Sequence, residues 1–413
     1  MLLQIGTLIA ATSLVQLANG FFNTFLSLRL TLEDFGPAAT GIVLSAYFVG
    51  FTIGAVSSGG VIQRVGHIRA YTAFAGLVVV ATALMPLWTS ALIWAACRVV
   101  IGIGCVGLFV TTESWLNAKA MPDQRGRIFS TYMVGTFLAL AIGQLAVAGF
   151  TIQAAGAFQV VIALFALALV MVSTTRAEAP GLKPEAGLRY GELSRQAPIS
   201  VVGCVVSGIV TGAFYALVPA WMLSNGAPQQ TIALFMLVAV LGGLAFQVPV
   251  GRLSDRNDRR LVLAGLAVGY AAAVILLVAM PRSLLAVLPV AALLGGFMST
   301  LYPVCVAHAL DRMPQDRVVA VSGRLILVSG IGSALGPLLG AQVMARLDIN
   351  GLLYFMAAIS ALLAALAALR IRQRAAPEQM SERPFAIIDP MTAPISQEPE
   401  ATEADGSPRP LPA

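Results

Sequence analysis

Twelve apolar runs of helical length, separated by short polar gaps, dominate this sequence of 413 residues. A helix needs roughly 20 apolar residues to cross the hydrocarbon core of a bilayer, which is about 30 Å thick. Charged residues make up only 11% of the chain, whereas they are about a quarter of an ordinary soluble domain. The sequence therefore predicts an all-α integral membrane protein with 12 transmembrane helices. The runs cover residues 4–28, 38–62, 69–87, 89–116, 128–151, 154–173, 198–223, 229–251, 260–280, 283–310, 318–344 and 349–370.

The runs fall into two sets of six, separated by one longer polar segment. This segment shows no apolar periodicity, and the residues after Arg374 are rich in Pro, Glu, Ala and Ser. Such a composition buries too little apolar surface to fold by itself. We therefore expect an N-terminal six-helix bundle over residues 1–173, a linker over 174–197, a C-terminal six-helix bundle over 198–371 and a disordered tail over 372–413.

Three short matches relate the two sets at a constant separation of 192 residues. Asn19-Gly20 aligns with Thr211-Gly212, Gly59 with Gly251, and Met121-Pro122 with Met313-Pro314. This register predicts two pseudo-symmetric bundles related by an axis along the membrane normal, with a solute site between them.

Small residues recur at spacings that let membrane helices approach closely. Helix faces that carry only small residues suit bundles that slide past one another, although tight packing alone also explains these residues. The glycines concerned are Gly50, Gly54, Gly102, Gly104, Gly332, Gly336 and Gly340.

Basic residues are concentrated in alternate gaps between the runs, and loops rich in Lys and Arg stay in the cytoplasm. This predicts a multi-pass protein of the cytoplasmic or inner membrane with both termini inside. It also accounts for the net charge of +6 without a nucleic-acid partner. The inside gaps hold Arg64, Arg69, Lys119, Arg125, Arg127, the linker, Arg252, Arg256, Arg259, Arg260, Arg312 and Arg317, and the outside gaps hold Arg29, Arg282 and Arg346. Because no charge precedes Arg29, the first run is expected to be a retained span and not a cleaved signal peptide.

Several motifs resemble those of the major facilitator superfamily (MFS). The segment Gly251-Arg-Leu-Ser-Asp255-Arg-Asn-Asp258-Arg-Arg260 is similar to its loop signature G-x-L-x-D-R-x-G-R-R, with Asp258 in place of glycine. In the first half, Gln63 stands where the family usually has Asp. Thr112-Glu113-Ser114-Trp115 and Tyr302-Pro303-Val304 resemble the YcaD-like group of bacterial inner-membrane transporters. The resemblance covers most of residues 1–370 and implies a secondary active transporter that moves a small solute by alternating access, with the proton as one candidate coupling ion.

Polar positions within the runs are the candidates for the solute site. Gln16, Asn19 and Asn23 share one helical face with Thr12, and the spacing recurs in Ser207, Thr211 and Tyr215 of the seventh run. The alternative for these faces is hydrogen bonding between helices. Tyr302 joins the set through its motif.

Arg98 lies near the middle of the fourth run. A charge at the bilayer centre costs about 2.5–3.5 kcal/mol by insertion scales, so it must face a wet cavity or a partner. Two interpretations stay open. Arg98 either binds an anionic or polar solute or couples to a proton, or it braces a neighbouring helix through backbone carbonyls.

Gating or coupling candidates lie near the predicted inner surface. Glu113 follows Arg98 by fifteen residues, which is about 22 Å along a helix, and is expected to pair with Arg64 or Arg125 in one conformation.

By family analogy, Asp255 is expected beside Arg127, where the helix dipole favours an anion. His308 is a candidate proton carrier because imidazole titrates near neutral pH, and Glu113 is another. Static ion pairs and a structural histidine are the alternatives.

No Gly-rich phosphate loop, HExxH or GxSxG motif is present, so we predict no enzymatic activity, no cofactor and no metal site. The four cysteines lie singly in apolar runs and are expected to be core residues. Two other functions stay open: a non-transporting membrane sensor or assembly protein, and an amphiphile or lipid transporter on the same fold. We expect a monomer in the lipid bilayer.

Overall fold

The computed structural model describes residues 2–175, 190–280, 283–313 and 317–373, and within these ranges it contains helices and no strand. Twelve of these helices are long and apolar enough to cross a membrane, so the predicted all-α membrane architecture is confirmed. The first six are α1 (Leu2–Leu32), α2 (Pro37–Val65), α3 (His67–Leu84), α4 (Ala91–Lys119), α5 (Pro122–Ala146) and α6 (Gly156–Ser173). The second six are α8 (Pro198–Ser224), α9 (Gln229–Arg256), α10 (Arg259–Ala279), α11 (Leu284–Leu310), α12 (Val318–Arg346) and α13 (Gly351–Gln373).

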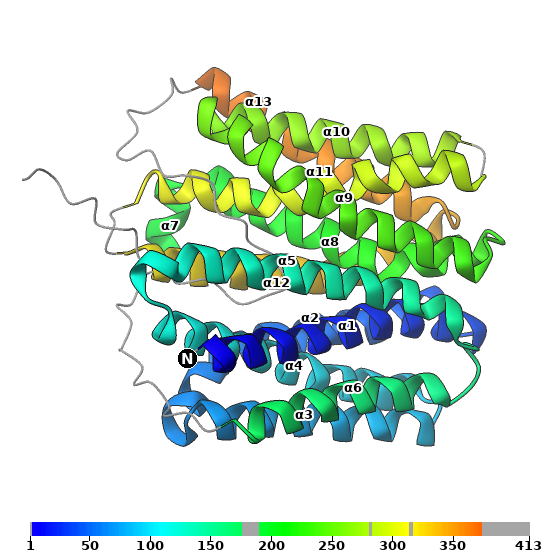
Figure 1. Cartoon of the computed structure of the whole chain (residues 1–413). Coiled ribbons are helices and arrows are strands. Elements are labelled where there is room, and N and C mark those ends of the chain that lie inside the picture. Colours follow the sequence, from blue (N-terminus) through cyan, green and yellow to red (C-terminus); the bar gives the residue numbers. More distant parts are fainter. Residues whose placement is uncertain (1, 176–189, 281–282, 314–316, 374–413) are drawn as a thin grey trace, which may run out of the picture.

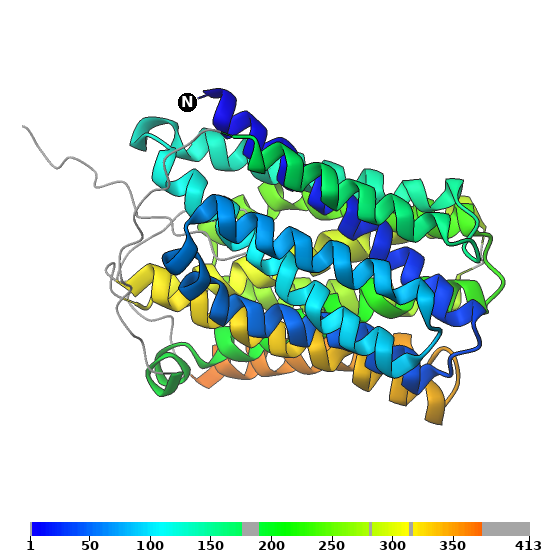
Figure 2. The same ribbon diagram turned by 90° about the horizontal axis from the view of Figure 1, so that it is seen from below.

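The long helices lie side by side and alternate in direction, so every second connection lies at the same end of the molecule (Figure 1). The N-terminus, the short helix α7 (Tyr190–Gln196) and the end of α13 lie at one end, which we call the linker end (Figures 1 and 2). We call the other end the distal end. The 3-10 turns η1 (Met85–Leu87) and η2 (Val147–Gly149) lie there.

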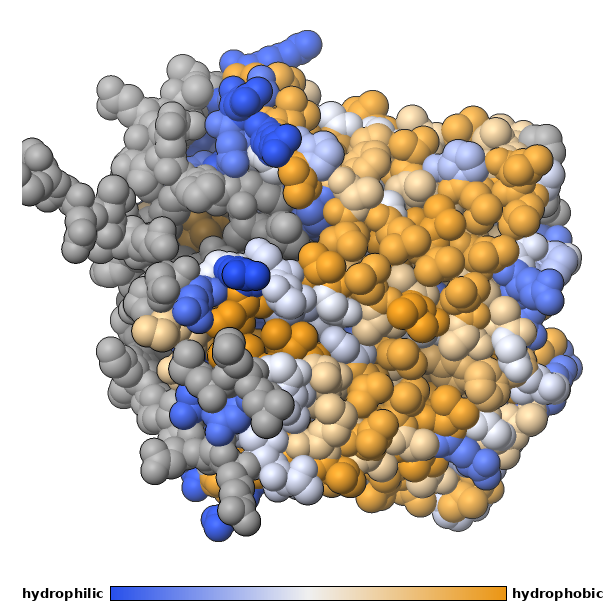
Figure 3. All heavy atoms as spheres, in the orientation of Figure 1, coloured by the Kyte–Doolittle hydropathy of each residue, from blue (hydrophilic) through white to orange (hydrophobic). Residues whose placement is uncertain are grey.

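The side of the bundle carries a broad apolar surface, whereas hydrophilic side chains gather towards the two ends (Figure 3). Leu92 and Leu285 are 81% and 89% exposed on this fold. Soluble monomers rarely expose apolar patches larger than a few hundred Å². The surface is therefore that of a protein solvated by lipid.

Local chemistry explains several helix boundaries. α2, α5 and α8 each begin with proline in the first turn, where a missing N–H breaks no hydrogen bond. Gly66 alone connects α2 to α3, with φ of 81° and its N–H donating to the carbonyl of Ile62. A side chain is strained at that φ, so the tight connection requires glycine.

Glycine contacts reveal how closely the two bundles repeat each other. On α2 and α4, a Cβ added to Gly50 would overlap the carbonyl of Val99, and one on Gly102 would overlap the carbonyl of Tyr47. The same contacts recur between α9 and α11, where Gly242 meets the carbonyl of Ala292 and Gly295 meets that of Ala239. The shift between equivalents is 192 residues for α2 and α9 and 193 for α4 and α11.

The packing of α1 on α5 repeats in the same way. Gly20 meets the carbonyl of Leu140 and Gly143 meets that of Leu17, while Gly212 meets the carbonyl of Ser333 and Gly336 meets that of Ile209. The repeat seen in sequence is thus a repeat of backbone contacts. Close approach at Gly50, Gly102, Gly332 and Gly336 is confirmed.

The two bundles meet mainly through three helix pairs, α1 with α8, α2 with α12 and α5 with α9, and α2 also contacts α8. Ser27 Oγ donates to the carbonyl of Ala216 at 2.6 Å. Gln229 Nε2, at the start of α9, donates to the carbonyls of Val147 and Phe150 at 2.6 and 2.8 Å. These bonds lie in the distal half of the molecule.

The last part of the predicted linker is helical. α7 occupies Tyr190–Gln196, and Leu193 and Ala197 are fully buried. Arg312 Nη1 donates to the carbonyl of Gln196 at 3.4 Å. Two buried apolar side chains are enough to dock one short turn on the second bundle. Residues 176–189 and the predicted disordered tail from 374 lie outside the described residues.

The close glycine contacts can be tested by mutation. Gly102→Ala and Gly295→Ala should each destabilise the protein by about 1–3 kcal/mol, because the methyl group forces two helix backbones apart. Gly59→Ala and Gly265→Ala are matched controls, since no atom outside their own helix lies within 4 Å of the added methyl group. Thermal unfolding in detergent measures the effect. Equal midpoints for all four variants would contradict the packing described here.

Candidate functional site

Arg98 is the cation most deeply enclosed by the first bundle. It lies on α4, is 1% exposed, and its Nη2 donates to Asn23 Oδ1 at 2.7 Å. Its guanidinium carbon lies 4.4 Å from the ring centroid of Tyr47 and 5.5 Å from that of Phe22. Nε and Nη1 have no hydrogen-bond partner, and no Asp or Glu among the described residues forms an ion pair with it. Bracing through backbone carbonyls is therefore not what this arginine does.

The polar face of α1 continues from Arg98 as a chain of side-chain hydrogen bonds. Asn23 Nδ2 donates to Asn19 Oδ1 at 3.4 Å, and Asn19 Nδ2 donates to the Tyr47 hydroxyl at 3.1 Å and to Gln16 Oε1 at 3.5 Å. We call Gln16, Asn19, Asn23, Tyr47 and Arg98 the Arg98 cluster. All five are buried, so in this conformation the α1 face packs against neighbouring helices and lines no open cavity.

Tyr47 was not among the residues singled out from sequence. It accepts from Asn19 and covers the guanidinium, so it joins α2 to both α1 and α4. The close approach at Gly102, directly against the Tyr47 carbonyl, brings its ring to Arg98. A tyrosine in the interior of an apolar run was the available signal, because a buried phenol needs a hydrogen-bond partner.

The second bundle carries hydroxyl side chains on its equivalent of the polar α1 face and no charge at the equivalent of Arg98. Ser207 and Thr211 on α8 are buried and their hydroxyls have no described partner. Tyr215 and Tyr302 are also buried. By the repeat, Tyr47 corresponds to Ala239 and Arg98 to Ala291. The two halves of the predicted site are therefore chemically unequal.

A pair of small polar groups sits at the same place in each bundle. Thr12 Oγ1 donates to Thr112 Oγ1 at 3.0 Å between α1 and α4. At the equivalent positions of α8 and α11, the thiols of Cys204 and Cys305 are hydrogen-bonding neighbours. These cysteines are free and buried, as expected for core residues.

Glu113 lies nearer the linker end of α4, where it is buried and accepts a hydrogen bond from the Tyr132 hydroxyl at 3.0 Å. The Tyr302 phenol of the second bundle is within its electrostatic reach. Arg125 Nη2 points instead at the carbonyl of Asn117, at 3.4 Å, and Arg64 is exposed. Pairing of Glu113 with either arginine stays a prediction for another conformation.

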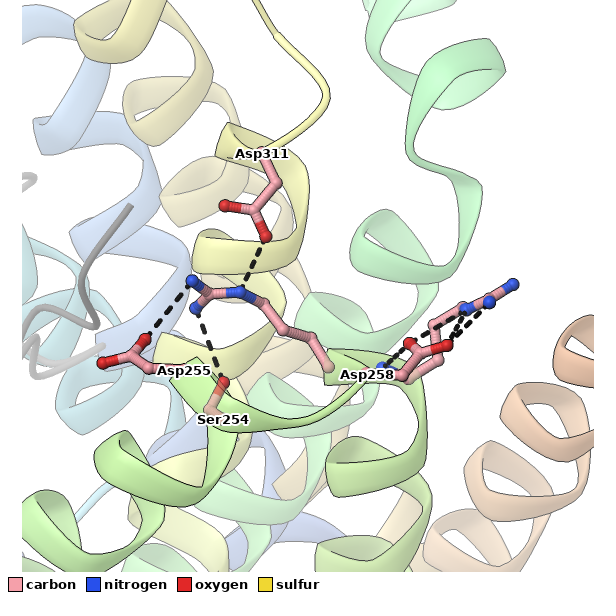
Figure 4. A network of polar contacts seen from close by, with 6 residues as sticks. Ser254, Asp255, Asp258 and Asp311 are labelled. Carbon is pink, nitrogen blue, oxygen red and sulfur yellow. Dashed lines mark hydrogen bonds and ion pairs between the residues drawn. The ribbon is translucent and has the colours of Figure 1, made fainter. Parts of the chain in front are cut away.

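A charged network joins α9, α10 and α11 at the linker end (Figure 4). Arg259 Nε pairs with Asp311 at 2.7 Å, and its Nη2 lies 3.4 Å from Asp255. The described contact of Asp255 is thus within the second bundle, and its expected approach to Arg127, which is exposed on α5, stays a prediction.

Asp258, the departure from the family signature, caps α10. Its carboxylate accepts from the Arg260 backbone N–H at 2.9 Å and pairs with the Arg260 guanidinium at 2.7 Å. Burial acts to raise the pKa of Asp258, but the hydrogen bonds from Arg260 outweigh it and lower that pKa. His308 is buried within electrostatic reach of Asp258. It therefore belongs to this network and lies on a different bundle from the Arg98 cluster.

The ion pairs of the linker-end network can be compared by mutation. Asp311→Ala should destabilise the protein by about 3–5 kcal/mol, because it leaves a buried Arg259 short of its main counter-ion. Asp255→Ala is the matched control, since that carboxylate is 36% exposed and its bond is longer, and an exposed pair contributes about 1 kcal/mol or less. Thermal unfolding in detergent compares them. A larger loss for Asp255→Ala would overturn the assignment of Asp311 as the main partner.

Comparison with known proteins agrees with this architecture. Residues 8–256 and 200–396 match the sequence profile of the Major Facilitator Superfamily. The MFS-type transporter YcaD of Escherichia fergusonii is 32% identical over 356 residues, covering 86% of this chain and 92% of YcaD. The YcaD of Shigella flexneri serotype 5b is 31% identical over 355 residues, with the same coverage.

Solved structures show the same fold at low sequence identity. The nucleoside transporter NupG superposes with a TM-score of 0.76 at 13% identity, covering 90% of this chain and 100% of NupG. A D-xylose–proton symporter superposes with a TM-score of 0.67 at 15% identity, covering 92% of this chain and 100% of the symporter. With twelve spanning helices and relatives over most of its length, the chain belongs to the major facilitator superfamily of membrane transporters.

Proposed function

We propose that this protein is a secondary transporter that moves a small solute across the cytoplasmic membrane by alternating access. In this proposal residues 1–173 and 198–371 move as two bodies in a monomer, and the linker end, with both chain termini, faces the cytoplasm. The solute binds between the bundles at the Arg98 cluster. The observation that carries the proposal is a fully buried arginine with unmet hydrogen-bond donors in the first third of a membrane-spanning helix, α4.

A purely structural role for Arg98 is a poor explanation of this geometry. A buried donor without a partner costs about 1–3 kcal/mol, and more when it is charged. A bracing arginine would use its donors on neighbouring carbonyls, yet only Nη2 is bonded, and to a side chain. The remaining donors, Nε and Nη1, fit acceptors supplied by the solute.

The contacts between bundles support motion about this site. The described hydrogen bonds across the interface, at Ser27 and Gln229, are in the distal half and use backbone carbonyl acceptors. Each such bond contributes only about 0.5–1.5 kcal/mol. We therefore interpret this conformation as closed at the distal end. Opening that end would break these hydrogen bonds and the packing of Gly41 on α2 against Pro337 on α12.

Glu113 is the better candidate for proton coupling than His308. It lies on the same helix as Arg98, and its neighbour Thr112 bonds to Thr12, which shares a face of α1 with Gln16 and Asn19. A polar path therefore joins the region of Glu113 to the Arg98 cluster within one bundle. His308 has no such connection, because it lies in the charged network of the second bundle.

Alternating access predicts opposite distance changes at the two ends of the molecule. Spin labels at Leu92 and Leu285 report on the distal end, and labels at Val65 and Leu253 report on the linker end. All four positions are exposed, whereas the four native cysteines are buried and should escape labelling. Pulsed electron paramagnetic resonance in nanodiscs, at acidic and neutral pH and with candidate solutes, should show the distal distance lengthening when the linker-end distance shortens.

The same measurement distinguishes the alternatives. A sensor or assembly protein that kept the fold without transport predicts distances that stay fixed at both ends. Distances that change in the same sense at both ends would indicate expansion of the whole bundle. Either result would contradict alternating access without requiring knowledge of the solute.

A further inference from the structure

We infer that the transported solute is a small monocarboxylate whose carboxylate binds one edge of the Arg98 guanidinium, through Nε or through Nη1. This inference deepens the proposed function and rests on it. It follows from the balance of donors, acceptors and charge within the Arg98 cluster.

The orientation of every amide in the cluster is fixed from Arg98 outwards. A guanidinium only donates, so Asn23 must present its oxygen to Nη2. The Asn23 amide nitrogen then donates to Asn19 Oδ1, and the Asn19 nitrogen donates to Tyr47 and to Gln16 Oε1. One arginine therefore sets the direction of the whole hydrogen-bond chain.

With these orientations, several donor groups of the Arg98 cluster have no acceptor. The side-chain oxygens of Gln16, Asn19 and Asn23 each accept a bond, whereas Gln16 Nε2 and Arg98 Nε and Nη1 remain without partners. A ligand that completes the cluster must therefore bring acceptors for these donors. An ionised carboxylate is acceptor-only, while amides, amines and hydroxyls all bring donors.

The charge requires an anion, and a single one. The cluster contains one cation and no carboxylate, and the corresponding positions in the second bundle are Ala291 and Ala239. A water molecule would accept a bond but leave the positive charge unbalanced. A phosphate dianion would leave a net negative charge in a medium where an uncompensated ion costs several kcal/mol. A monoanion balances the site.

Aromatic rings restrict how the anion approaches. Tyr47 and Phe22 lie within 4.4 and 5.5 Å of the guanidinium carbon and cover the group. These cation–π contacts stabilise the cation before the solute arrives. Donors lie in the plane of a guanidinium, so the carboxylate binds at its edge, where charge-assisted hydrogen bonds are strongest.

The test compares matched ligand pairs on the full-length protein in detergent. The probes are lactate, benzoate, nicotinate and hippurate, each beside its primary amide, together with phenyl phosphate. A ligand that binds the folded state raises the thermal unfolding midpoint by mass action. At least one carboxylate should bind about tenfold or more tightly than its amide and more tightly than the phosphate. Arg98→Gln should abolish this preference, whereas Arg69→Gln, which removes an exposed arginine, should retain it.

Three results would overturn the inference: no carboxylate stabilises the wild-type protein, an amide or the phosphate binds as well as the carboxylates, or Arg98→Gln keeps the carboxylate response. If Arg98→Gln fails to fold, the comparison of each acid with its amide on the wild-type protein still decides. Failure here leaves transport itself untouched, because the spin-label distances test alternating access with or without a carboxylate.

Discussion

The burial of one positive charge inside a lipid-embedded helix bundle is the constraint on which the rest of this account depends. In the hydrocarbon region no water is available to solvate a guanidinium, so the protein must supply partners or leave room for a ligand that does. Here it supplies part of what is needed, through Asn23 and the rings of Tyr47 and Phe22, and leaves Nε and Nη1 unmet. A site that is stable when empty and incomplete without an anion is what a transporter needs, because the solute must both bind and leave.

The repeat of backbone contacts explains how such a site is held. Glycines bring α2 against α4 and α1 against α5 in the first bundle, and the same contacts recur in the second. Each bundle is built from close backbone approaches. Between the bundles, α2 also packs closely on α12, where Gly41 meets the carbonyl of Pro337, and the described hydrogen bonds across the interface are those of Ser27 and Gln229. The chemistry placed on this scaffold differs between the halves. The first holds the charge, and the second holds hydroxyls and alanines at the equivalent positions. The two halves thus share their backbone packing and differ in the side chains placed on it.

The sequence predicted most of the fold, and the site only in part, for identifiable physical reasons. The number and length of the helices follow from bilayer thickness and hydropathy, so both can be predicted directly from the sequence. The face shared by Gln16, Asn19 and Asn23 follows from helical periodicity, and the structure brings these residues together with Arg98. Tyr47 was not identified from sequence, because its place in an apolar run indicates only that its hydroxyl needs a partner, whereas its contact with Arg98 depends on how α2 crosses α4. α7 was not predicted from the sequence, because its docking depends on only two apolar side chains in a polar segment. The predicted pairings of Glu113 and Asp255 with arginines stay predictions, because they are expected in another conformation and a sequence does not show which conformation is populated.

The most direct test of the central claim is an experimental structure of the protein with a bound carboxylate, at a resolution that places individual side-chain atoms. The account predicts ligand density between the bundles with carboxylate oxygens about 2.7–2.9 Å from Arg98 Nε or Nη1, and with the Asn23 and Tyr47 contacts of the guanidinium retained. Solute density elsewhere, with the Arg98 donors satisfied by backbone carbonyls, would contradict it and would return Arg98 to a purely structural role.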